Sequence, residues 1–130
     1  MRPLYFDTAA TTFTNADVSA DMLDVLRDND ANPSSSHLFG QRAAALVTAA
    51  RDTVASELGC DADEVIFTAG ATEANNLALR GIALAHRDQG RHIVTSAIEH
   101  KAVLACCESL QPDGVETTYV QPNGGGWVTP

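Results

Sequence analysis

Strand-like and helix-like segments alternate along the second half of this chain, and this alternation limits its fold more than any other feature. Val65-Ile66-Phe67 and Ile93-Val94 are unbroken apolar runs, typical of parallel strands buried on both faces. The periodicity predicts strands at 64–69, 91–97 and 115–120 and helices at 72–88 and 101–110. We therefore expect an α/β chain with part of a mostly parallel sheet, whose open edges need covering.

The first 58 residues instead predict an arm, a loop and two helices. Residues 1–14 are expected to be extended, and Asn15 to cap a helix that ends near Arg27. After a loop over residues 28–36, Ser34 and Ser36 are candidate caps for a long alanine-rich helix. That helix is expected to run from Ser36 to Leu58, where Gly59 stops it.

Composition excludes several classes of function. The 130 residues carry a net charge of −9 with a single lysine, which argues against nucleic acid binding. No apolar run approaches the ~20 residues that a membrane-spanning helix needs. Met1 to Asp7 lacks the apolar stretch of a signal peptide, so we expect a cytoplasmic protein. Three cysteines fit reduced thiols better than a disulfide framework.

The stretch Thr68-Ala69-Gly70-Ala71-Thr72-Glu73-Ala74-Asn75-Asn76 joins the first predicted strand to a helix. A small-residue turn there exposes the backbone N–H groups that open the helix, and these groups attract anions. Thr72 adds a hydroxyl donor beside them. The pattern favours a phosphate site, but Thr72 as a plain helix cap fits it too.

A second loop follows the next predicted strand, in Ser96-Ala97-Ile98-Glu99-His100-Lys101-Ala102-Val103. It carries His100 at the carboxyl end of that strand, where ligands gather in parallel sheets. An imidazole exchanges protons near neutral pH. Two neighbouring loops, one suited to phosphate and one bearing an imidazole, indicate a cofactor pocket.

These two motifs carry a resemblance to a known family, together with Asp7-Thr8-Ala9-Ala10-Thr11-Thr12 and Asn32-Pro33-Ser34-Ser35-Ser36-His37. The chain resembles the N-terminal part of the cysteine desulfurases, in the class V aminotransferase group of fold-type I pyridoxal-phosphate enzymes. The resemblance covers nearly the whole chain. It implies an N-terminal arm, helix and loop over residues 1–40 and an incomplete PLP-binding large domain over 41–130.

The resemblance implies a transferase that takes sulfur from L-cysteine, giving L-alanine and an enzyme persulfide. The implied cofactor is pyridoxal 5'-phosphate. The implied partners are a sulfur-acceptor protein, as in iron-sulfur assembly, and a second copy of the complete chain in a homodimer.

The resemblance also implies roles for individual residues. Ala71 and Thr72 match positions that hold the cofactor phosphate. His100 matches a catalytic histidine that stacks over the cofactor ring and moves protons. Asn32 and Ala9 match segments beside the substrate, although Asn32 also suits a simple turn.

The family's cofactor-binding lysine and sulfur-accepting cysteine lie in a later part of the chain than these 130 residues. Lys101 follows His100 directly and is expected at the surface. Cys106 and Cys107 are expected to be packing residues, and no spacing suggests a metal. We therefore expect the chain alone to be inactive.

Three alternatives stay open. The chain fits a non-catalytic or split-subunit module that needs a partner chain. It also fits another class V enzyme, such as a selenocysteine lyase. A nucleotide-binding α/β domain has little support, because its glycine-rich motifs are absent from the sequence.

Overall fold

The computed structural model describes residues 4–29 and 31–129. It divides into two compact units, Met1–Val65 and Ile66–Pro130, which are described separately below. The parts of the predicted arm and loop at residues 1–3 and 30, and the final residue, lie outside the described residues. The predicted boundary between residues 40 and 41 concerns family domains and stays a prediction.

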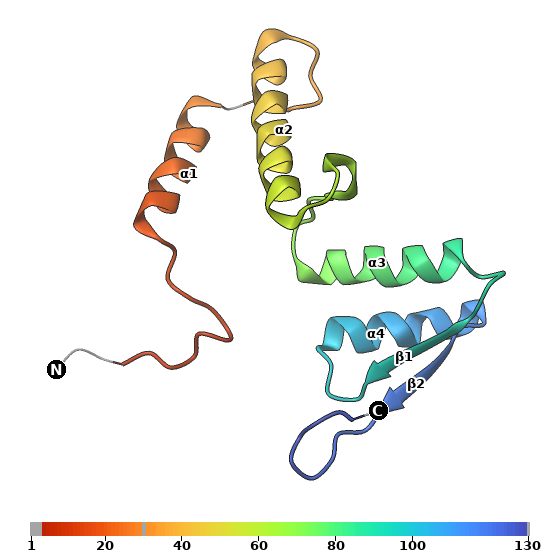
Figure 1. The fold of residues 1–130 in the computed structure, drawn as a ribbon. Helices are drawn as coiled ribbons and strands as arrows, with labels where there is room; N and C mark the ends of the chain where they lie inside the picture. The colour runs from red at the N-terminus through yellow and green to blue at the C-terminus, as the bar shows by residue number, and fades with distance from the viewer. Residues whose placement is uncertain (1–3, 30, 130) are drawn as a thin grey trace. The chain divides into compact units, whose positions relative to one another are not determined.

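The first helix of the N-terminal unit is α1, Ala16–Asp28 (Figure 1). Asn15 caps it as predicted, because its Oδ1 accepts a hydrogen bond of 2.7 Å from the amide of Asp17. None of the residues of α1 is buried. Its apolar residues therefore lie at the surface of the described part of the chain.

The long helix α2, Leu38–Leu58, ends at Gly59 as predicted, where φ of 69° gives the left-handed conformation that glycine favours. Its N-cap differs from the prediction: His37, and neither Ser34 nor Ser36, caps the helix through Nδ1. Near the start of α2 the chain passes so close to Gly40 that a Cβ atom there would overlap the carbonyl oxygen of Ser35. This close approach requires glycine.

The C-terminal unit contains α3, β1, α4 and β2 in that order. Strands β1 (His92–Ser96) and β2 (Glu116–Val120) are parallel, and helix α4 (Lys101–Leu110) connects them. Both strands and α4 lie where the sequence predicts them. Helix α3, Ala71–Ala85, packs along α4 (Figure 1) and ends three residues before the predicted 88.

A small hydrophobic core joins the helices of this unit to its sheet. It consists of buried Cys106, Leu110 and Val115, with Leu79, Ala83 and Ile93 packed against them. Side chains alternate between the two faces of a strand, so Val94 points away from this core, and it is 63% exposed. The sheet is therefore covered on one face.

The prediction of a strand over residues 64–69 is wrong. Ala62–Glu64 forms a single 3₁₀ turn, η1, and Val65 is extended but belongs to no sheet, because β1 and β2 make the one sheet within the described residues. Ile66 and Phe67 are 64% and 49% exposed. An apolar sequence favours a strand, but a strand forms only when another strand supplies hydrogen-bond partners.

Candidate functional site

The C-terminal unit contains a hollow of about 670 Å³ that brings together the three residues predicted to bind the cofactor. Ala71 and Thr72 reach it from the first turn of α3, and His100 from the residue before α4. Its remaining walls come from Ala69, Gly70, Glu73 and Asn76. Two loops that follow different apolar segments thus meet at one cavity.

The first turn of α3 exposes its backbone donors. Gly70 is the N-cap, and the first hydrogen bond of the helix runs from the amide of Ala74 to the carbonyl of Gly70, at 3.1 Å. The amides of Ala71, Thr72 and Glu73 precede that bond and so have no partner within the helix. Thr72 is the second helical residue, so its alternative role as the N-cap is wrong.

Glu73 and Asn76 are hollow-lining residues that the resemblance did not single out. Oε2 of Glu73 accepts a hydrogen bond of 2.7 Å from the amide of Ala69, which fastens the turn before the helix. Nδ2 of Asn76 donates to the carbonyl of Thr72 at 2.9 Å. A glutamate at the third helical position is a known capping signal, so Glu73 could have been found from the sequence.

His100 is the N-cap of α4, and its ring is tied to that helix. Nδ1 accepts a hydrogen bond of 3.1 Å from the amide of Ala102. The carbonyl of His100 also accepts from the amides of Val103 and Leu104. The side chain is exposed and lines the hollow, so the ring is held in place at the cavity wall.

Ala9 and Asn32, the predicted substrate contacts, lie in turns of the N-terminal unit. Ala9 lies in a turn where the carbonyl of Asp7 accepts from the amides of Ala10 and Thr11. Oδ1 of Asn32 accepts a hydrogen bond of 2.8 Å from the amide of Ser34. This bond forms the simple turn that the sequence allowed as the alternative to a binding role for Asn32. Their contacts with substrate stay predictions.

The remaining candidate residues behave as packing or surface groups. Cys106 and Cys107 are buried, as predicted, and burial raises the pKa of the Cys107 thiol. All three cysteines are free thiols. Lys101 is the exposed first residue of α4. Within residues 4–29 and 31–129, no three His, Cys, Asp or Glu side chains gather as a metal site would require.

None of the helices in the described ranges is both long and apolar enough to span a membrane.

Comparisons with known proteins identify the family. The class-V aminotransferase family model matches residues 4–130. The chain is 44% identical over 129 residues to a putative cysteine desulfurase IscS 1 of Bacillus subtilis, and 42% identical over 129 residues to the cysteine desulfurase IscS of Dictyoglomus turgidum. Each match covers 99% of this chain, but 34% and 33% of those relatives.

A solved structure described as SspA in complex with cysteine has the same fold. It superposes with a TM-score of 0.84 at 38% sequence identity, covering 96% of this chain and 36% of that one. The architecture is therefore that of part of a fold-type I α/β enzyme. The chain belongs to the class-V aminotransferase family and spans about a third of the length of the relatives it matches.

Proposed function

We propose that the chain is the N-terminal portion of a pyridoxal-phosphate-dependent cysteine desulfurase. The observation that carries the proposal is the meeting of Ala71, Thr72 and His100 at one hollow. The named cysteine desulfurases among its relatives support the same reaction. The reaction would move the sulfur of L-cysteine to an enzyme thiol and leave L-alanine.

The residues of the hollow fit the cofactor. Backbone amides at the start of α3 and the Thr72 hydroxyl provide donors for a phosphate, and the helix dipole adds positive potential. The volume of about 670 Å³ lies within the usual range for small-molecule pockets. The carboxylate of Glu73 is the one acidic group of the wall, and it already accepts the Ala69 amide.

Each residue then has a defined task. Ala71 and Thr72 would hold the phosphate, and His100 would lie against the ring and handle protons. When bound, pyridoxal phosphate withdraws electrons from the Cα atom of an amino acid. Asn32 and Ala9 would contact the L-cysteine substrate. None of the three cysteines is assigned as the sulfur-accepting thiol, and the two buried ones are shielded from substrate.

The same proposal includes a sulfur-acceptor protein, a homodimer and the cytoplasm. The free thiols of Cys60, Cys106 and Cys107 support a reducing compartment. The alternative is a split-subunit module that needs a partner chain. Gel filtration with candidate partner chains would test it: a stable complex that restores activity to residues 1–130 would support that alternative.

The test of the proposed function is an assay of the full-length protein that contains residues 1–130. It should bind pyridoxal phosphate and release alanine from L-cysteine, and His100→Ala should lower turnover by about 10²–10⁴-fold. His86→Ala, at an exposed histidine after α3, is the control and should have no effect. Selenocysteine turned over in strong preference to cysteine would identify a lyase instead, and wild-type turnover in His100→Ala would remove His100 from the reaction.

A further inference from the structure

We propose that the amide of Ala102 holds His100 as the neutral tautomer with its proton on Nε2, so that the ring takes up a proton only when the N-cap of α4 opens. The inference deepens the proposed function and rests on it, because it concerns how His100 handles protons at the cofactor hollow. It would make Ala102 a positioning residue that acts through its backbone.

The hydrogen bond at Nδ1 fixes the tautomer. The Ala102 amide can donate to Nδ1, at 3.1 Å, only if this nitrogen carries no proton. A neutral imidazole keeps one proton, so that proton must lie on Nε2. The backbone of His100, with φ of −60° and ψ of 146°, has the extended shape usual for an N-cap and keeps the ring over the first turn.

Proton uptake therefore has a structural consequence. Nε2 is already protonated in this tautomer, so an incoming proton must bind Nδ1. It would then face the Ala102 N–H, and the cap hydrogen bond would break. In the capped state the ring offers the hollow a hydrogen-bond donor, whereas acceptance of a proton from a bound ligand requires the first turn of α4 to open.

Three charged residues line the hollow with His100 or flank it in sequence. Glu73 reaches the same hollow from α3, with Oε2 engaged by the Ala69 amide. Glu99 and Lys101 flank His100 in sequence, and both are exposed. None of the three has a hydrogen bond to the ring that would replace the one from Ala102.

The chain offers a matched control in His37. Its Nδ1 accepts from the amide of Gly40 at 3.3 Å, so it also caps a helix through Nδ1, although the donor is the third helical residue and not the second. His37 lies in the other unit and is not among the residues that line the cofactor hollow. Both histidines are thus N-caps, but only His100 lines the hollow.

The experiment uses the full-length protein labelled with ¹⁵N-histidine, without cofactor. The His100 and His37 signals are assigned as those lost in His100→Asn and His37→Asn, because asparagine keeps a cap acceptor. In its neutral form, each ring should show a protonated Nε2 and an unprotonated Nδ1. A protonated Nδ1 on His100, or an equal mixture of tautomers, would overturn the proposal.

Hydrogen exchange measures the coupling between protonation of His100 and opening of the α4 cap. On acidification, the Ala102 amide of the wild type should exchange faster than that of His100→Asn, which cannot take up a proton. Equal exchange in both proteins at every pH would also overturn the proposal. Neither readout depends on pyridoxal phosphate. If His100 has the other tautomer, the proposed function still stands, and if the protein does not bind the cofactor, the tautomer can still be measured.

Discussion

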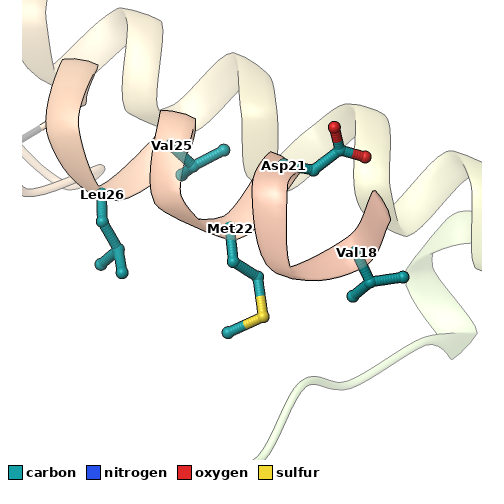
Figure 2. Close-up of a pocket in the computed structure, with 5 residues that line it drawn as sticks. All are labelled: Val18, Asp21, Met22, Val25 and Leu26. Atoms are coloured by element: carbon teal, nitrogen blue, oxygen red, sulfur yellow. The ribbon is translucent and has the colours of Figure 1, made fainter. Parts of the chain in front are cut away.

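Helices α1 and α4 are both amphipathic, but α4 has buried apolar residues whereas α1 has none. Leu110 of α4 is fully buried against α3 and the sheet. Leu26 of α1 is 71% exposed and lines an open apolar hollow of about 370 Å³ with Val18, Met22 and Val25 (Figure 2). The β-α-β connection supplies α4 with packing partners nearby in sequence, whereas none of the residues of α1 is buried. An apolar stripe alone does not make a core.

The variants with the largest expected effect replace one leucine in each helix with alanine. Leu110→Ala should destabilise the 130-residue chain by about 2–5 kcal/mol, because it leaves a cavity in a packed core. Leu26→Ala should change the free energy of unfolding by less than about 0.5 kcal/mol. Urea denaturation measures both. Equal losses would mean that α1 is packed as tightly as α4.

A second pair of variants compares one glycine from each unit. Gly40→Ala should destabilise the chain by about 1–3 kcal/mol, since a Cβ atom there overlaps the backbone of Ser35. Gly81→Ala, inside α3 with open space around it, should stabilise by about 0.5–1 kcal/mol through helix propensity. Thermal unfolding of the two variants would show shifts of opposite sign. A gain in stability from Gly40→Ala would show that the loop before α2 lies farther away.

The smallest effect concerns the cysteines. Iodoacetamide should label partly exposed Cys60 in the native chain and reach Cys106 and Cys107 after unfolding. Burial raises the pKa of Cys107, so its contribution to stability is present below the pKa of an unfolded thiol, about 8.5, and is lost as pH rises. Unfolding free energy should therefore fall more steeply at alkaline pH in the wild type than in Cys107→Ala. Identical pH profiles would contradict this.

Local signals predicted much of the fold. Asn15, Gly59 and the bounds of α4 follow from capping and periodicity, which depend on neighbouring residues. The strand at 64–69 failed because pairing depends on residues far away in sequence. His37 replaced serine as the cap of α2, next to the close approach of Ser35 to Gly40, which the sequence pattern did not show.

The sequence predicted part of the candidate site as well. Motif register selected Ala71, Thr72 and His100 as candidates, and the structure brings them to one hollow, while their roles stay predictions. The contact of Glu73 with Ala69 was missed, although its capping position signals it. The tie between His100 and Ala102 depends on the rotamer of the ring, which no sequence pattern specifies.

The most direct measurement of the central claim compares two ligands in Thr72→Val, made in the full-length protein. Loss of the hydroxyl should weaken pyridoxal phosphate binding about tenfold to a hundredfold, the equivalent of one charge-assisted hydrogen bond. A variant without the cofactor-binding lysine keeps covalent attachment from masking the loss, and Thr48→Val on α2 is the matched control. Pyridoxal, which has no phosphate, should bind equally well with and without the Thr72 hydroxyl. If Thr72→Val leaves pyridoxal phosphate affinity unchanged, or weakens both ligands alike, the phosphate does not bind at the start of α3.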